Sequence, residues 1–147
     1  MKSKPLKILH IDDDLSCRLA TAEFFTFMGG HIVEVAENGR EGLEKAAEIR
    51  PDIILLDMNM PDMNGMEVMD ALCACAATRD IPVIIITGAG LSDSEQESLE
   101  LKPNFMRLEQ KPADFERLLG EIEAALLPGI PGTRKRGLVF GGSPEPG

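Results

Sequence analysis

Residues 51–65 read PDIILLDMNMPDMNG, and within them a run of apolar side chains ends abruptly at one acid, Asp57. The run Ile53–Leu56 is short, rich in β-branched residues and flanked by proline on both sides. This pattern predicts a strand that is buried on both faces of a parallel sheet. Ligands of such sheets bind beyond the carboxyl ends of the strands, so Asp57 is a candidate site residue. A capping role in a loop is the competing explanation for one acid considered alone.

The length and composition indicate one acidic domain. The chain has 147 residues and a formal net charge of −10, from 25 acidic and 15 basic side chains. This balance argues against direct binding to DNA or to an anionic membrane. The three cysteines favour reduced thiols without a zinc site, and no apolar run reaches the roughly 18 residues of a membrane span. We therefore expect a cytoplasmic protein.

Apolar runs of strand length alternate with amphipathic segments along the rest of the chain. Besides the central run, strands are predicted at residues 7–12, 31–37, 82–87 and 105–112. Helices are predicted at residues 15–28, 39–50 and 112–127, after Asn64, and after a cap at Ser92 or Ser94. Five strands that alternate with five helices imply an α/β fold with a parallel sheet and right-handed crossovers. The fifth strand is the most polar, which suits the edge of the sheet.

The apolar positions of these helices define the faces that we expect against the sheet. In the first helix they are Leu15, Leu19, Ala22, Phe25 and Met28. In the second, third and fifth helices they are Leu43, Ala46, Ala47, Met66, Met69, Leu72, Cys73, Ala76, Phe115, Leu118, Leu119, Ile122 and Leu126. Polar positions between them are expected in solvent.

The last segment differs in composition from the domain before it. Ten of the twenty residues from Pro128 onward are Gly or Pro. This composition predicts a disordered tail at 128–147 after a single domain at 1–127. The tail contains the basic trio Arg134–Arg136 and the apolar trio Leu138–Phe140. Both could contact a partner, but we favour a solvated tail.

Polar side chains follow four of the five predicted strands. The first strand leads to Asp12 and Asp13, the third to Asp57, the fourth to Thr87 and the fifth to Lys111. Because the carboxyl ends of parallel strands share one edge, these five residues are expected to converge. Each alone has an ordinary structural explanation, since acids cap helices and a single lysine is usually solvated. The complete set at matching strand ends favours a common site.

Three carboxylates placed together repel each other, by about 4 kcal/mol per pair at roughly 4 Å and an effective dielectric constant near 20. A hard divalent cation removes this cost, and Mg²⁺ accepts one or two carboxylates while water and phosphate oxygens complete its shell. We predict Asp13 and Asp57 as direct ligands and Asp12 as a ligand through water. The cation would neutralise a phosphoryl group that arrives on Asp57, while Thr87 and Lys111 bind the phosphoryl oxygens.

These residues lie within motifs that resemble those of a known family. The motifs are Asp12–Asp13 after the first strand, LLDMNMPDMNG around Asp57, Thr87–Gly88 and Lys111–Pro112. Over residues 6–127 the chain resembles the receiver domain of two-component response regulators, in particular the single-domain, chemotaxis-regulator-like kind. The resemblance implies a flavodoxin-like (βα)5 three-layer sandwich with strand order 2-1-3-4-5. It also implies a phosphoacceptor signalling module, which takes a phosphoryl group from a histidine kinase or a histidine phosphotransfer protein and then switches the binding of a downstream protein.

The resemblance also assigns the parts of the site. It implies phosphorylation of Asp57, Mg²⁺ held by Asp13, Asp57 and the Asn59 carbonyl, phosphoryl oxygens bound by the backbone of Asn59 and Gly88, and a cis peptide between Lys111 and Pro112. The family usually has an aromatic switch residue three positions before the lysine, whereas this chain has Leu108 there and Phe105 out of register. The switch is therefore assigned to Thr87 and Leu108.

Three other functions would use similar residues. A dehalogenase-like phosphatase also forms an aspartyl phosphate with Mg²⁺, but it places an acid two residues after the nucleophile, where this chain has Asn59. A flavodoxin-like nucleotide binder would need a phosphate loop at Asp12–Asp14, which repels phosphate. A receiver-like scaffold that works without phosphorylation stays open because of Leu108. His10 and His31 do not suit phosphoryl donation, so we expect an external donor and no reaction beyond the chain's own phosphorylation and dephosphorylation.

Overall fold

The computed structural model describes residues 4–88 and 90–127, which form one five-stranded sheet and five helices. The strands are β1 (Lys7–Ile11), β2 (Ile32–Ala36), β3 (Ile53–Asp57), β4 (Val83–Thr87) and β5 (Phe105–Gln110). The helices are α1 (Leu15–Phe27), α2 (Gly39–Ile49), α3 (Gly65–Ala74), α4 (Asp93–Glu100) and α5 (Phe115–Leu126). The predicted tail at 128–147 lies outside the described residues.

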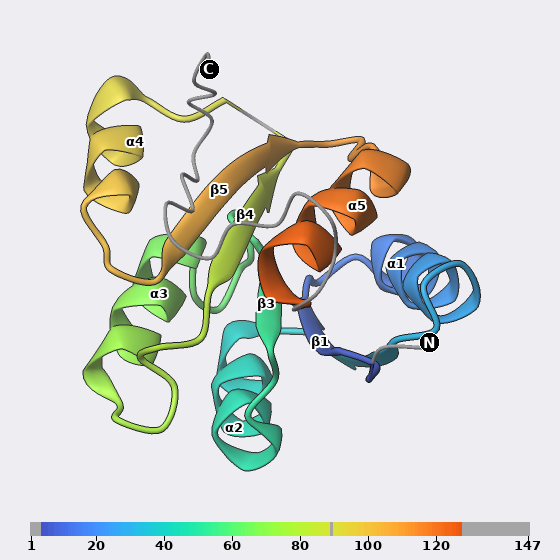
Figure 1. Cartoon of the computed structure of the whole chain (residues 1–147). Coiled ribbons are helices and arrows are strands. Elements are labelled where there is room, and N and C mark those ends of the chain that lie inside the picture. Colours follow the sequence, from blue (N-terminus) through green and yellow to red (C-terminus); the bar gives the residue numbers. More distant parts are fainter. Residues whose placement is uncertain (1–3, 89, 128–147) are drawn as a thin grey trace.

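The predicted strand order is confirmed. All strands run parallel in the order β2-β1-β3-β4-β5, with β3 in the middle and β5 at an edge. Helices α1 and α5 cover one face of the sheet, and α2, α3 and α4 cover the other (Figure 1). The result is a three-layer sandwich in which the carboxyl ends of the strands meet at one edge. No helix in the described part of the chain is long and apolar enough to span a membrane.

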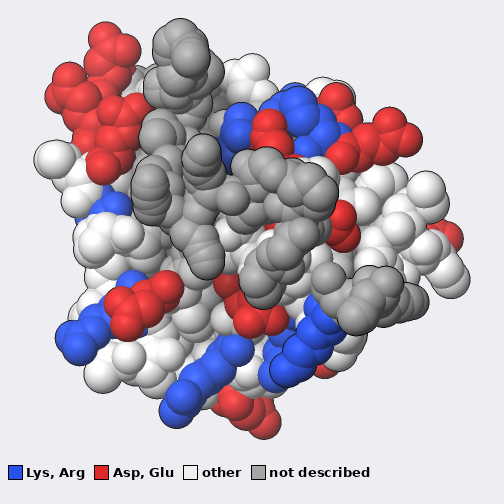
Figure 2. Space-filling view, in the orientation of Figure 1, with Lys and Arg blue, Asp and Glu red and all other residues white. Residues whose placement is uncertain are grey.

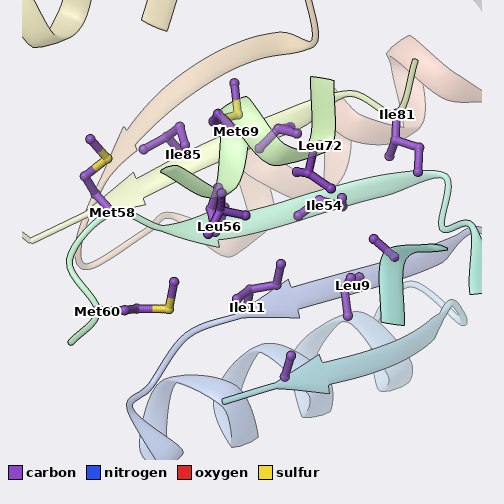
Figure 3. Close-up of a cluster of buried hydrophobic side chains, with 14 of the residues drawn as sticks. Leu9, Ile11, Ile54, Leu56, Met58, Met60, Met69, Leu72, Ile81 and Ile85 are labelled. Carbon is purple, nitrogen blue, oxygen red and sulfur yellow. The ribbon is translucent and has the colours of Figure 1, made fainter. Parts of the chain in front are cut away.

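β3 belongs to both halves of the hydrophobic core, because alternate side chains of a strand point to opposite faces. Ile54 and Leu56 pack with Met69 and other side chains of the α2–α3–α4 layer (Figure 3). Ile53 and Leu55 pack in the second cluster, against α1 and α5. All five residues of β3 are buried. A strand covered on both faces has no position for a solvated side chain, which explains why the apolar run is uninterrupted up to its last residue.

Each helix starts at a side chain that accepts hydrogen bonds from the first backbone N–H groups of the helix. These N-cap residues are Asp14, Asn38, Asn64, Ser92 and Asp114. Asn64 and Ser92 form capping boxes with Glu67 and Glu95. The caps satisfy backbone donors that have no partner within the helix, and they fix where each helix begins after its loop. Of the two caps predicted for α4, Ser92 is confirmed.

The predicted inward face of α1 was confirmed at Phe25, which is fully buried, but was wrong at three other positions. Leu15, Leu19 and Met28 are 59%, 60% and 65% exposed. The cause is the contact between α1 and α5, where the rings of Phe24, Phe25 and Phe115 lie 5.3 to 5.7 Å apart. Burial of these rings sets the rotation of α1 about its axis and leaves the two leucines in solvent.

The predicted face of α2 was wrong at one position, since Ala47 is exposed while Gly42 and Ala46 are buried. A Cβ atom at position 42 would lie 2.5 Å from Ile11 Cδ1, so the helix backbone approaches β1 very closely there. This approach is possible only with glycine, and it turns the Gly42–Ala46 side of α2 toward the sheet. In the next helix, α3 ends at Ala74, and Ala76 therefore lies outside its apolar face.

Candidate functional site

The five residues predicted to converge lie around one end of the sheet. Asp57 is the last residue of β3 and Thr87 the last of β4, while Asp12 and Lys111 follow β1 and β5 directly. One carboxylate oxygen from each of Asp12, Asp13 and Asp57 lies within 4.8 Å of the other two. The Lys111 ammonium lies 3.1 Å from Asp12 Oδ2 and 3.5 Å from Asp57 Oδ1. The topology therefore gathers three acids and one base from three separate segments, with Thr87 at the end of a fourth.

Asp12 is a buried carboxylate that the fold keeps ionised. Burial by itself would raise its pKa, but hydrogen bonds from His10, from the Asp14 backbone and from Lys111 outweigh that effect and lower the pKa to about 2. The bond from the Asp14 N–H to Asp12 Oδ1 measures 2.8 Å. Arg18 Nη1 also donates to the Asp12 carbonyl oxygen at 2.8 Å, which anchors the loop after β1 to α1. Asp12 thus contributes a fixed negative charge.

Asp57 differs electrostatically from its neighbour. Its side chain is buried, and burial followed by the negative charge of Asp12 raises the pKa of the Asp57 carboxyl, against the opposing effect of Lys111. Burial alone would lower the pKa of Lys111, but the hydrogen bond to Asp12 and the charges of both acids raise it. The ammonium is therefore firmly protonated, yet it does not fully compensate the carboxylates around it.

Thr87 lies beside the acids and is connected to both neighbouring loops. Its hydroxyl oxygen accepts a long, 3.5 Å hydrogen bond from Asn59 Nδ2, and its carbonyl oxygen accepts one of 2.9 Å from the Lys111 N–H. Thr87 is fully buried, whereas Asn59 and Gly88 are exposed. The loop residues can therefore meet a ligand while the hydroxyl position is set by the sheet. The peptide between Lys111 and Pro112 is cis, as the sequence resemblance implied.

The loop after β3 folds back tightly because Gly65 begins α3 against it. The Gly65 N–H donates to the Met58 carbonyl oxygen at 2.8 Å. A Cβ atom on Gly65 would lie 2.7 Å from Met58 Sδ and 3.0 Å from Met58 Cα. Backbone cannot move aside as a side-chain end can, so glycine is required there. This contact fixes the backbone next to Asp57.

His10 is a site neighbour that the sequence analysis did not assign. It is buried on β1, and its Nε2 lies 3.5 Å from Asp12 Oδ2. The period of two along a strand places residues 10 and 12 on the same face, which is the signal that would have indicated this contact. His10 therefore helps to stabilise the ionised form of Asp12.

The region assigned to switching contains one irregularity in the sheet. The pairing of β4 with β5 shifts register between Val83 and Ile84, so Phe105 pairs with Val83 while Leu108 pairs with Ile85. Both Phe105 and Leu108 pack against the α2–α3–α4 layer of the core. Leu108 is half-buried. It pairs with Ile85, two residues before Thr87, whereas Phe105 pairs with Val83 at the start of β4 and so does not take the place of Leu108.

The donor set fits a hard divalent cation. Its three acids offer oxygen ligands within 4.8 Å of one another, and the raised pKa of Asp57 indicates that more positive charge would be stabilising there. Mg²⁺ prefers oxygen ligands of this kind. Asp13 is exposed, so one side of the cluster is open to a cation and to its water ligands.

Comparisons with known proteins agree with this arrangement. The model of the response regulator receiver domain family matches residues 8–123. PilH of Pseudomonas aeruginosa is 40% identical over 98 residues, which are 66% of this chain and 78% of PilH. The structure of the chemotaxis protein CheY4 of Vibrio cholerae is similar with a TM-score of 0.71 and 30% identity, over 82% of this chain and 98% of that one.

Other relatives are longer proteins. A protein-glutamate methylesterase/protein-glutamine glutaminase of Archaeoglobus fulgidus is 34% identical over 95 residues, which are 65% of this chain but 26% of that protein. The chain spans about half the length of the response regulator MprA of Mycolicibacterium vanbaalenii. The match thus lies in a module that these proteins share. With its fold, its acidic site and these similarities, the chain belongs to the response regulator receiver domain family, the phosphoacceptor signalling modules of two-component systems.

Proposed function

We propose that Asp57 accepts a phosphoryl group from a histidine kinase or a histidine phosphotransfer protein. The observation that carries the proposal is the position of Asp57, at the end of the central strand with Lys111 Nζ 3.5 Å from Oδ1 and two other acids within 4.8 Å. A carboxylate with its fixed neighbours needs little reorganisation to act as a nucleophile.

The transfer exchanges one bond to phosphorus for another. An Asp57 carboxylate oxygen attacks the phosphorus, the new O–P bond forms, and the bond to the donor imidazole nitrogen breaks as that nitrogen leaves. Lys111 and the Thr87 hydroxyl bind the phosphoryl oxygens, together with backbone N–H groups of Asn59 and Gly88. To bind a phosphoryl oxygen, Lys111 must weaken its contacts with the acids. The 3.5 Å between Lys111 Nζ and Asp57 Oδ1 therefore describes the site before phosphorylation.

Asp13, Asp57 and the Asn59 carbonyl are the residues that would hold Mg²⁺, with Asp12 acting through water. When bound, Mg²⁺ supplies positive charge beside the phosphoryl oxygens. The residues themselves set the geometry, because His10 and Lys111 hold the Asp12 carboxylate in place. The exposed Asp13 is then free to bind the cation on the solvent side of the cluster.

Phosphorylation is proposed to shift the loops around Thr87 and Leu108 between two arrangements and so to change the binding of a downstream protein. Residues 1–127 form the receiver domain in this proposal. A nucleic-acid partner is not proposed. Figure 2 shows acidic side chains gathered over α4, which carries Asp93, Glu95, Glu97 and Glu100 and no basic residue.

We further propose that the chain turns over no outside substrate and works in the cytoplasm. Asn59 stands where a dehalogenase-like phosphatase needs an acid, and its amide donates to Thr87 instead of carrying a transferable proton. Cys17, Cys73 and Cys75 are free thiols, as is usual in a reducing compartment.

The test is phosphorylation by a small donor. The protein is mixed with Mg²⁺ and acetyl phosphate, and intact mass spectrometry is expected to find one acid-stable, base-labile phosphoryl group. Asp57→Asn should remove it, whereas Asp80→Asn, at an exposed acid of α3's following turn, should not. An undiminished adduct on Asp57→Asn would refute the assignment. Absence of any adduct would favour a receiver-like scaffold that works without phosphorylation. Steady turnover of a phosphomonoester would favour a dehalogenase-like phosphatase.

A further inference from the structure

Strand β2 forms an edge of the sheet, because it pairs with β1 on one side and has no neighbour among the described residues on the other. The Ile32 N–H donates to the Leu6 carbonyl oxygen at 2.9 Å, so the backbone groups of Ile32 face β1. Successive residues of a strand direct these groups to opposite sides. The N–H and C=O groups of Val33 and Val35 therefore point away from the sheet.

Side chains of α2 cover one end of this free edge. Lys45 Nζ donates to the Val35 carbonyl oxygen at 2.6 Å, and Glu41 Oε1 accepts from the Glu37 N–H at 2.8 Å. In the described part of the chain, the Val33 N–H, the Val33 carbonyl and the Val35 N–H have no partner strand. The open part of the edge therefore suits a segment of about three residues.

Apolar side chains are exposed on both faces beside this edge. Ile32 is 49% exposed and lies on the α2 face, because it pairs with Lys7, whose Nζ donates to the Ile49 carbonyl oxygen of α2. On the opposite face, Phe27 and Met28 at the end of α1 are 76% and 65% exposed. A strand added at an edge directs alternate side chains to both faces. One short apolar strand could thus contact exposed side chains on each face.

The described chain ends close to the start of β2. His31, which directly precedes β2, pairs through Nε2 with Glu123 Oε2 near the end of α5, at 2.8 Å. Leu127 follows one helical turn after Glu123. From Leu127 to Leu138 an extended chain spans up to roughly 36 Å, at about 3.3 Å per residue, which is enough to pass the end of α1. Residues 138–140 read LVF, a composition typical of strands.

The connection to such a strand would have the usual hand. Helix α1 leads from β1 outward to β2, and α5 covers the same face of the sheet as α1 (Figure 1). A parallel strand beyond β2 would be reached from β5 across that face and in the same direction. The crossover would therefore have the hand of β1–α1–β2, and such crossovers are nearly always right-handed.

We propose that residues 138–140 bind the free edge of β2 as a sixth, parallel strand of the sheet. The pairing goes beyond the phosphoacceptor function and does not rest on it. These residues belong to the segment that composition alone predicts to be solvated, and pairing would hold them against the domain. It would also cover an edge at which a second copy of the chain could otherwise pair.

Amide hydrogen exchange of the full, unphosphorylated chain, measured by NMR, tests the pairing. The double variant Leu138→Pro/Val139→Pro removes two adjacent N–H groups, so it breaks the pairing whichever of them faces β2. It should speed exchange of the Val33 and Val35 amides about tenfold. The Ile32 amide, which bonds to β1, should keep its exchange rate.

Gly142→Pro/Ser143→Pro is the matched control, because it makes the same change beyond the pairing segment and should leave all these rates unaltered. Equal exchange of Val33 and Val35 in the native chain and in the Leu138→Pro/Val139→Pro variant would overturn the proposal. Faster exchange that includes Ile32 would do the same, since the variant would then act on the stability of the whole domain. Protection that rises with protein concentration would assign the edge to a second copy instead.

Discussion

Lys111 Nζ lies 3.1 Å from Asp12 Oδ2, although 99 positions separate these residues in the sequence. Asp12 is completely buried, while the Lys111 side chain is about one quarter exposed. The contact joins the end of β1 to the end of β5 across the intervening ends of β3 and β4. It therefore places one ammonium over a cluster of acids that would otherwise repel each other.

Lys111→Met should lower the free energy of unfolding by about 2 kcal/mol at pH 7 in EDTA, because it leaves Asp12 buried without its cation. Saturating Mg²⁺ should reduce this loss, since a bound cation stabilises only the folded state. Urea denaturation with and without Mg²⁺ measures both effects.

Lys102→Met is the control for this change. Lys102 pairs with Asp70, whose side chain is 64% exposed, and removal of such a surface pair should cost less than about 1 kcal/mol in either buffer. Equal losses for the two variants would contradict the view that Lys111 serves a buried acid.

Asp57→Asn should stabilise the protein at neutral pH. The raised pKa of Asp57 means that, between its ordinary value and the folded value, the folded state holds a proton that the unfolded state has lost. Stability from this group is therefore present at low pH and falls as the pH rises through that window. At pH 7 in EDTA the variant should gain on the order of 1 kcal/mol, and at pH 3 the gain should vanish. A gain in stability that is larger at pH 3 than at pH 7 would show that the pKa of Asp57 is not raised in the folded state.

Glu109 lies in a second ionic cluster, between β5 and α5. Its carboxylate is 4% exposed and is held by Arg117 Nη2 at 2.8 Å and Arg107 Nε at 2.9 Å, and both arginines also contact Glu121. Glu109→Gln should cost about 3 kcal/mol, because two guanidinium groups lose the charge of a buried partner. Glu121→Gln, at a far more exposed acid, should cost less than about 1 kcal/mol by the same urea measurement. Similar costs would contradict a special role of the buried acid.

The parallel sheet and the acids at the strand ends were predictable, because both depend on local patterns, whereas the strand order came only from the resemblance to the receiver family. The run Ile53–Leu56 has no polar interruption, and its abrupt end at Asp57 marks the edge of the sheet. Once the alternation of strands and helices implied a parallel sheet, the convergence of Asp12 and Lys111 followed from topology alone. This inference required no knowledge of the distance between the two side chains.

Features that depend on contacts between distant elements were not predictable. Leu15 and Leu19 have helical spacing, but the aromatic contact with Phe115 of α5 determines which side of α1 is buried. Likewise, the polar sequence of β5 correctly indicated an edge strand, yet it gave no sign that Glu109 is buried. That burial depends on Arg117, a residue of the following helix.

Gly42 and Gly120 provide a final pair of opposite predictions, both for Gly→Ala in a helix. Alanine usually stabilises a helix interior by about 0.5–1 kcal/mol relative to glycine. Gly120→Ala should show this gain, because no atom of the described residues outside the local backbone of α5 lies within 4 Å of its new Cβ. At Gly42 the Cβ would lie 2.5 Å from Ile11 Cδ1 and 2.8 Å from Ile11 Cγ1, so α2 or β1 must shift.

Gly42→Ala should therefore lose about 1–3 kcal/mol despite the better helix propensity of alanine. Ile11 immediately precedes Asp12, so a shift of β1 is also expected to slow phosphorylation by acetyl phosphate, which Gly120→Ala should leave unchanged. Thermal or urea unfolding and the rate of adduct formation measure the two effects. If both variants were stabilised, the close packing of α2 on β1 would not be what fixes the end of that strand.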